Sequence, residues 1–232
     1  MSVDFIYITK GMSSTRNTER VLVIGDTHHP FEHSNYLNHC KAVAKFYKTT
    51  HTIHIGDGID NHYASFHDTS TESYGAGEEL QRAIDHLAPW HKAFPNTDYI
   101  LGNHCRIIER KLNAGGINKK WMRNFVDVLG LDTWRIHDEV IYDNVLYQHG
   151  EGLTARKEIG HNGMSVVQGH RHTEGYVWYQ RMKNKQYFGM QVGTGIDEKA
   201  YAFAYAKHHP KPILSCGVVL NHGKSAHLIP LI

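Results

Sequence analysis

The feature that most constrains the fold of this chain is an alternating apolar run, residues 51–55, that stops at Gly56 and delivers Asp57 into a loop. Two other apolar runs, residues 20–24 and 99–101, also stop at a glycine, and Asp26 and Asn103 follow them. Short apolar runs of this kind are typical of strands buried on both faces of a sheet. Ligands of open α/β sheets bind beyond the carboxyl ends of the strands, so the sequence predicts a site centred on Asp57.

Apolar residues at helical spacing lie between and after these strands. We expect helices at 34–47, 78–94, 106–112 and 118–129, with Ser34 as the N-cap of the first and a kink at Pro89 in the second. A short strand is predicted at 4–9. After residue 131 the pattern changes to short strands, at 134–136, 139–142, 145–148, 165–168, 176–179, 186–192, 213–220 and 226–230, with Asp143-Asn144 as a hairpin turn.

A strand-helix half joined to a mostly antiparallel half predicts an α/β fold. We expect a four-layer α/β/β/α sandwich of two mixed β-sheets flanked by helices, in which the C-terminal strands close the second sheet. The chain has 232 residues, 41% of them hydrophobic, and no internal repeat or linker. It therefore suits a single domain over residues 1–232.

Composition argues against several classes of protein. The three cysteines form no Cys-x-x-Cys pair, which argues against a disulfide framework or a cysteine zinc site. No apolar run is long enough for a membrane-spanning helix, and the net charge of +2 does not by itself indicate a nucleic-acid or membrane partner. We expect a cytoplasmic protein without a membrane partner, and the sequence leaves its oligomeric state open.

Five groups of polar residues each follow a predicted apolar strand. In chain order they are Asp26 with His28, Asp57, Asn103 with His104, His149, and His170 with His172. A lone histidine is usually structural, but five such groups at corresponding strand ends favour convergence on one centre. Carboxylate, amide and imidazole donors suit divalent metals, and one carboxylate can bridge two metal ions.

In their order and spacing these groups resemble the motifs of the calcineurin-like metallophosphoesterases. The motifs stand here as Asp26-Thr27-His28, Gly56-Asp57-Gly58-Ile59-Asp60, Gly102-Asn103-His104, His149 and Gly169-His170-Arg171-His172. The resemblance covers residues 20 to 172 and is closest to compact single-domain members. Such members are frequent in bacteriophage genomes, and a phage-encoded protein would work in the host cytoplasm.

The resemblance implies a dinuclear metal centre. One ion would be held by Asp26, His28, Asp57 and His172, and the other by Asp57, Asn103, His149 and His170. These donors suit Mn, Fe, Zn, Co or Ni, with Mn favoured, better than Ca or Mg.

The resemblance also implies a mechanism, in which a hydroxide that bridges the metals attacks phosphorus. His104 would protonate the leaving oxygen as the catalytic acid. Asp60 matches the carboxylate that orients this histidine, and its alternative interpretation is a residue that caps the loop.

Two positions depart from the family pattern. Cys105 stands where an acidic residue commonly follows Gly-Asn-His, so any charge support from that position is lost and Asp60 becomes the expected partner of His104. Asn61 stands where protein phosphatases have an arginine that clamps a phosphate dianion. This second departure argues against a protein phosphatase.

Three functions are compatible with these motifs: a phosphodiesterase or nuclease, which we favour, a phosphomonoesterase acting on nucleotides or phosphoproteins, and a non-catalytic binding module on the same fold. The third predicts lost ligands, and none is lost. The substrate would be a phosphate ester such as a nucleotide or nucleic acid.

Four residues are expected to bind the substrate: Asn103, Arg106, Arg171 and His62. The loop 61–74 is the expected specificity element, with a solvated polar loop as the alternative. The stretch 106–123 is basic and contains Trp121, which suits a nucleic-acid backbone and a stacked base. A solvated helix face with Trp121 in the core is the alternative.

Overall fold

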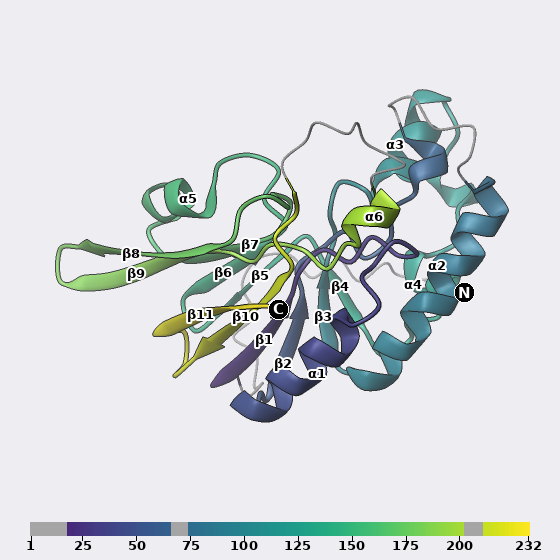
Figure 1. The fold of residues 1–232 in the computed structure, drawn as a ribbon. Helices are drawn as coiled ribbons and strands as arrows, with labels where there is room; N and C mark the ends of the chain where they lie inside the picture. Colours follow the sequence, from purple (N-terminus) through teal and green to yellow (C-terminus); the bar gives the residue numbers. More distant parts are fainter. Residues whose placement is uncertain (1–17, 66–73, 202–210) are drawn as a thin grey trace.

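Two mixed β-sheets lie face to face in the computed structural model, which describes residues 18–65, 74–201 and 211–232 (Figure 1). The first sheet has the order β11-β10-β1-β2-β3-β4, with strands Ser225–Pro230, Ser215–Leu220, Arg20–Ile24, His51–His54, Thr97–Ile100 and Arg135–His137. The second has the order β5-β6-β7-β9-β8, with strands Glu139–Tyr142, Val145–Gln148, Ser165–Gln168, Lys185–Gln191 and Tyr176–Met182.

Helices cover the outer faces of both sheets. The long helices α1 (Tyr36–Tyr47) and α2 (Ala76–Ala93) pack on the first sheet, and α5 (Ala155–Asn162) packs on β7 and β9 of the second. The remaining helices are α3 (Ile107–Ala114), α4 (Phe125–Leu129), α6 (Glu198–Tyr201) and the 3₁₀ turns η1 (His62–Ala64) and η2 (Lys119–Trp121). The predicted four-layer α/β/β/α sandwich is therefore confirmed.

Strand β1 shows why the run 20–24 carries no polar alternation. Its Val21 and Val23 face the second sheet, whereas Leu22 and Ile24 face the helices α1 and α2. Because successive side chains of a strand point to opposite faces, a strand between two apolar layers must be apolar throughout. The two apolar layers bury β1 in the middle of the molecule, and the site lies beyond its carboxyl end.

Some predicted helix boundaries were wrong. Helix α1 begins two residues after the predicted N-cap Ser34, and the residue before it, Asn35, makes no side-chain cap. The predicted helix 118–129 is two separate turns, because the side chains of Asn118 and Asn124 accept hydrogen bonds from Lys120 N and Val126 N and start a new turn each time. Pro89 lies inside α2, which continues to Ala93. The predicted strand 4–9 lies outside the described residues.

The second half of the chain pairs only partly as predicted. Strands β6, β7 and β9 are parallel neighbours, while β5 and β8 pair antiparallel at the two edges, so the second sheet is mixed, as predicted. Strands β10 and β11 return to the first sheet, where β10 pairs antiparallel with β1, so the C-terminal strands do not close the second sheet. Helix α5, which was not predicted, connects β6 to β7. The hairpin turn Asp143-Asn144 is confirmed, with both residues at positive φ.

Asp98 on β3 is a buried carboxylate with four polar partners. It lies 2.7 Å from His51 Nε2 and Arg135 Nε and 2.9 Å from His137 Nε2, and it accepts a 2.7 Å hydrogen bond from Tyr142 of the second sheet. Burial alone raises the pKa of this carboxyl, but the hydrogen bonds outweigh it and hold the pKa well below its usual range. This network ties the two sheets together away from the site.

We expect Asp98→Ala to lower the free energy of unfolding by about 3–5 kcal/mol, because it leaves these donors buried without their acceptor. Urea denaturation at pH 7 measures the change. The control Asp132→Ala removes an exposed carboxylate and should change stability by less than about 1 kcal/mol. A depressed pKa stabilises the fold above the unfolded-state value, so the wild type should lose this contribution as the pH falls below about 4. An equal loss in both variants would contradict the network.

Among the described residues, no helix combines the length and the apolar composition that crossing a bilayer requires.

Candidate metal centre

All five polar groups converge at the carboxyl ends of the strands. Asp26 follows β1, Asp57 follows β2, and Asn103 follows β3, while His149 and His170 follow β6 and β7 of the other sheet. His28, Asp57 and His170 have φ values of 49°, 43° and 66°. This left-handed conformation is uncommon for residues other than glycine, and such strain clusters at functional sites.

Asp26, His28 and His172 form the first group of donors. His172 Nε2 lies 3.1 Å from Asp26 Oδ2 and 3.2 Å from His28 Nε2. Asp26 and His28 are fully buried, and His172 reaches the surface. Since these atoms lie within 4.8 Å of one another, one metal ion could contact all three.

Asp57, Asn103, His149 and His170 form the second group. His149 Nε2 lies 3.0 Å from both Asp57 Oδ2 and Asn103 Oδ1, and His170 Nδ1 lies 3.0 Å from the same Asn103 oxygen. Asp57 Oδ2 is also 3.9 Å from His28 Nε2 of the first group. Asp57 therefore lies between the two groups, as a bridging carboxylate must.

Glycines make this approach of the strand ends feasible. A Cβ atom at Gly102 would overlap Asp57 Oδ1, and one at Gly169 would overlap Asp26 Oδ1. Both positions therefore need a residue without a side chain, because a larger one would push a carboxylate out of the centre.

Asp60 contacts two histidines rather than one. Its Oδ1 lies 2.6 Å from His28 Nδ1 and 3.3 Å from His104 Nδ1, and the closest partner of His104 Nδ1 is the backbone carbonyl of Asp60, at 2.6 Å. The backbone N–H of His104 donates to Asp57 Oδ1 at 2.8 Å. Asp60 thus orients both rings, and His28 Nε2 points toward the donors of the first group.

The electrostatics of the centre reflect two carboxylates buried together. Burial opposes their ionisation, but neighbouring histidines, His149 first, lower the pKa of Asp26 and bring that of Asp57 well below its ordinary value. Burial likewise lowers the pKa of His149, yet the charges of Asp57 and Asp26 prevail and raise it to about 9. For His104, hydrogen bonding to Asp60 and the charge of Asp57 outweigh burial and raise the pKa to about 9. The ionised carboxylates of Asp26 and Asp57 therefore need positive charge beside them.

This donor set fits divalent transition metals. Asp26 Oδ1 is buried and has no hydrogen-bond partner among the described residues. His149 Nδ1 donates to the carbonyl of Ile55 at 3.2 Å, which directs Nε2 to the centre, as is usual for a metal-binding histidine. Two carboxylates, one amide oxygen and four imidazoles would supply the charge and donor atoms that such ions prefer.

The residues expected to bind substrate are placed less uniformly. Asn103 lies in the second group. Arg106 donates to Asp138 at 2.7 Å and lies 3.5 Å from Glu151, and Arg171 donates to Glu174 at 3.3 Å, so both guanidinium groups are engaged with carboxylates. His62 is 3% exposed, and its Nδ1 lies 3.9 Å from Asp60 Oδ2.

Two further residues support the site and carry no sequence motif. Glu79 on α2 accepts hydrogen bonds from His62 N at 2.6 Å and Tyr63 N at 3.1 Å and so holds the turn after Asp60. Burial and the charge of Asp60 raise the pKa of Glu79 to about 7. The Tyr99 hydroxyl accepts a hydrogen bond from Gly58 N at 2.8 Å. No local motif marks either residue, because each acts across a long stretch of sequence.

Cys105 does not take the place of a carboxylate. Its Sγ is 3.1 Å from the Tyr99 hydroxyl and 3.9 Å from Asp57 Oδ1, and burial followed by the charge of Asp57 raises the pKa of the thiol to about 11. Cys105 therefore stays a neutral thiol, and the carboxylate that pairs with the His104 ring is that of Asp60, 3.3 Å from Nδ1.

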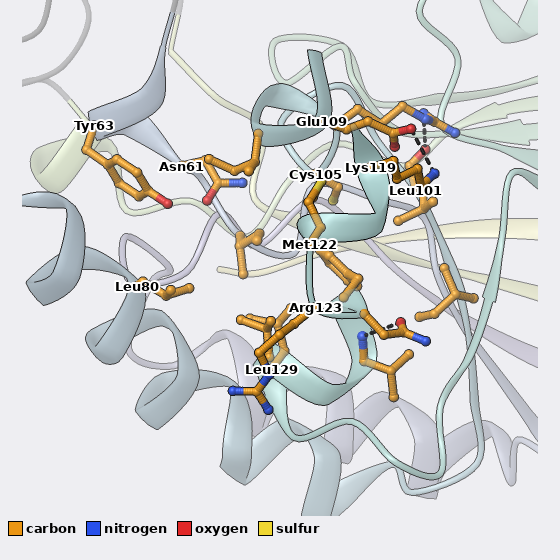
Figure 2. Close-up of a pocket in the computed structure, with 18 residues that line it drawn as sticks. Asn61, Tyr63, Leu80, Leu101, Cys105, Glu109, Lys119, Met122, Arg123 and Leu129 are labelled. Carbon is orange, nitrogen blue, oxygen red and sulfur yellow. Dashed lines mark hydrogen bonds and ion pairs between the residues drawn. The ribbon is translucent and has the colours of Figure 1, made fainter. Parts of the chain in front are cut away.

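A pocket of about 600 Å³ adjoins the centre on the side of α3 and α4 (Figure 2). Asn61, Tyr63 and Cys105 lie at one part of its wall, and Met122 and Arg123 lie at another. Most of the remaining wall is aliphatic or aromatic. Asn61 Nδ2 donates to the carbonyl of His104 at 3.0 Å, so one residue of the pocket wall contacts the backbone of His104.

The fold and the convergent donors define a metal-dependent phosphoesterase of the α/β/β/α type. The family model described as calcineurin-like phosphoesterase matches residues 19–216, and the chain belongs to this family. No curated protein matches the chain.

Several solved structures are similar over most of their length. Vacuolar protein sorting 29 from Cryptosporidium parvum is 12% identical, with 90% of this chain and 89% of that chain covered and a TM-score of 0.49. Chaetomium thermophilum Vps29 is 13% identical, with 90% and 88% covered and a TM-score of 0.45. YfcE, a phosphoesterase from E. coli, is 13% identical, with 92% and 100% covered and a TM-score of 0.44.

Proposed function

We propose that the chain is a dinuclear metal-dependent phosphodiesterase that acts on nucleotides or nucleic acid. The observation that carries the dinuclear centre is the position of Asp57 between two groups of donors, 3.0 Å from His149 and 3.9 Å from His28. Asp26, His28, Asp57 and His172 would hold one ion, and Asp57, Asn103, His149 and His170 the other. When bound, the ions would supply an activated water and neutralise charge on the phosphoryl oxygens.

The chain's own residues divide the remaining work. His104 is partly exposed beside the two groups, so its imidazole can donate a proton to the leaving oxygen of the ester. Asp60 holds Nδ1 of this ring through its backbone carbonyl and its carboxylate, which keeps Nε2 available to the substrate. The buried donors exclude bulk water, which strengthens every interaction with the phosphoryl group.

The preference for a diester rests on the arginines around the site. A monoester carries a second negative charge that a cation must match. Asn61 stands where protein phosphatases have the clamping arginine, and its amide donates to the His104 carbonyl. Arg106 and Arg171, the two candidates to replace that arginine, are paired with Asp138 and Glu174. This arrangement favours the single charge of a diester.

We expect hydrolysis of bis-nitrophenyl phosphate to exceed that of nitrophenyl phosphate by roughly tenfold in kcat/KM, the effect of about 1.4 kcal/mol of unmatched charge interaction. Both esters release the same chromophore, so one assay with Mn²⁺ compares them. Asn61→Arg should raise monoester hydrolysis relative to the diester. A wild-type preference for the monoester would support a phosphomonoesterase instead.

The surface next to the pocket suits a polymer. Trp121 is 85% exposed, so the alternative that buried it in the core is wrong. Lys120 precedes it and is exposed, while Lys119 pairs with Glu109 at 2.8 Å. An exposed indole beside cations could stack a base and attract phosphates, which favours a nucleic-acid substrate.

Trp121→Ala combined with Lys120→Glu should raise KM for a single-stranded oligonucleotide roughly tenfold, since a stacked base contributes about 1–3 kcal/mol. The rate on bis-nitrophenyl phosphate should stay unchanged because the small ester does not reach this surface. Phe46→Ala is the control, as Phe46 is 79% exposed on α1 near the opposite ends of the strands. An unaltered KM for every polymer would count against a nucleic-acid substrate.

A further inference from the structure

A second set of possible metal donors lies outside the candidate metal centre. His29 and Glu32 come from the segment between β1 and α1, and His86 comes from α2. Their donor atoms lie within 4.8 Å of one another, and none of the three residues belongs to the two groups around Asp57. The segment and the helix thus meet at one carboxylate.

The geometry shows why a cation fits between these residues. Glu32 Oε1 is 2.9 Å from His86 Nδ1, and Glu32 Oε2 is 2.8 Å from His29 Nδ1. The second contact is short, yet it lacks hydrogen-bond geometry, and neither nitrogen of the His29 ring has a hydrogen-bond partner within the described parts of the chain. The His29 ring is fully buried, and Glu32 is 14% exposed. Buried polar atoms without partners cost free energy unless an ion or water satisfies them.

We propose that His29, Glu32 and His86 bind a further divalent ion of the zinc type. Two imidazoles and one carboxylate are a donor set that zinc accepts, with water in the fourth position. Imidazole ligation disfavours Ca²⁺ and Mg²⁺. His86 is 43% exposed, so the ion enters from solvent and does not pass through the centre at Asp57.

The ion would anchor the segment that carries His28 to α2. His29 is the next residue after His28, and its backbone N–H and carbonyl bond Gly58 O at 2.9 Å and Asp60 N at 3.1 Å. The His29 ring also contacts Trp90 of α2, with ring centroids 5.8 Å apart. A metal at this place would therefore cross-link α2 to two loops of the candidate centre without contacting the substrate.

The test is the metal content of the protein after equilibrium dialysis against micromolar Zn²⁺. Elemental analysis should find one equivalent less zinc in His86→Ala than in the wild type, and the same deficit in Glu32→Gln. The control His91→Ala removes another histidine of α2, one that lies 2.8 Å from Thr133 Oγ1, and should retain the wild-type content. The difference in zinc content between the wild type and each variant tests the proposed site independently of the number of ions bound at Asp57.

A second measurement separates a bound ion from an ion pair. Zinc should raise the melting temperature of the wild type more than that of His86→Ala, and the two should differ less in EDTA. Equal zinc contents in His86→Ala and wild type, with equal responses to zinc, would overturn the proposal. Glu32 would then serve only as an acceptor between two histidines.

Discussion

Asp57→Asn is expected to lower the rate of hydrolysis by roughly 10³-fold or more and to lower the metal content of the purified protein. The neutral amide offers one oxygen in place of two and cannot balance the charge of two dications. Asparagine keeps the size of the side chain and tolerates the left-handed backbone at this position, where φ is 43°, so the fold should survive. Elemental analysis and turnover of bis-nitrophenyl phosphate measure the two effects.

The matched control for this variant is Asp85→Asn, which neutralises an exposed carboxylate of α2 that accepts a hydrogen bond from Gln81. It should leave both metal content and turnover unchanged. Near-normal turnover of Asp57→Asn with full metal occupancy would refute the bridging role.

His104→Ala should slow hydrolysis by roughly 10²–10⁴-fold while the metal content stays at the wild-type level, because the variant loses a proton donor and no donor atom of either group. The loss should be smallest for nitrophenyl esters, whose leaving group needs little protonation, and largest for an alkyl or ribose ester. A series of diesters with leaving groups of rising pKa measures this dependence.

The same variant tests an alternative that the structure itself raises. Donor atoms of His104, His28 and Asp57 also lie within 4.8 Å of one another, so His104 could be a ligand. Loss of metal in His104→Ala would assign it that role and remove it as the acid. His161→Ala, on the exposed side of α5, is the control and should change neither quantity.

The metal-binding candidates were within reach of sequence reasoning because each comes directly after a buried strand. Gly56 and Gly102 follow two such strands, and the next residues, Asp57 and Asn103, must therefore lie beyond the carboxyl ends of the strands. The pairing of the C-terminal strands could not be predicted, because it depends on contacts between distant parts of the chain. The sequence of β10 is small and apolar along its length, and the strand is buried on both faces, but nothing in it reveals that its neighbour is β1.

The contacts that hold the site residues in place were also hard to predict from the sequence. The proximity of Asp60 to His104 was expected from the family resemblance, whereas the shorter contact of Asp60 with His28 leaves no mark in the sequence. Glu79 bonds residues 16 and 17 positions away and has the sequence context of an ordinary acidic residue near a helix start. Local patterns thus predicted which side chains meet, while the residues that hold them depended on tertiary packing.

The burial of the donors has a consequence for the order of events at the centre. Asp26, His28, Asp57 and His149 are buried, whereas Asn103, His104, His170 and His172 are partly exposed. Under the proposed function, incoming ions would pass the same four side chains that a phosphate ester would contact. If the centre binds metal ions as proposed, an ester or product bound there would cover that entrance, and the ions would load before the substrate and leave after the product. Occupancy by phosphate would protect the metals from a chelator.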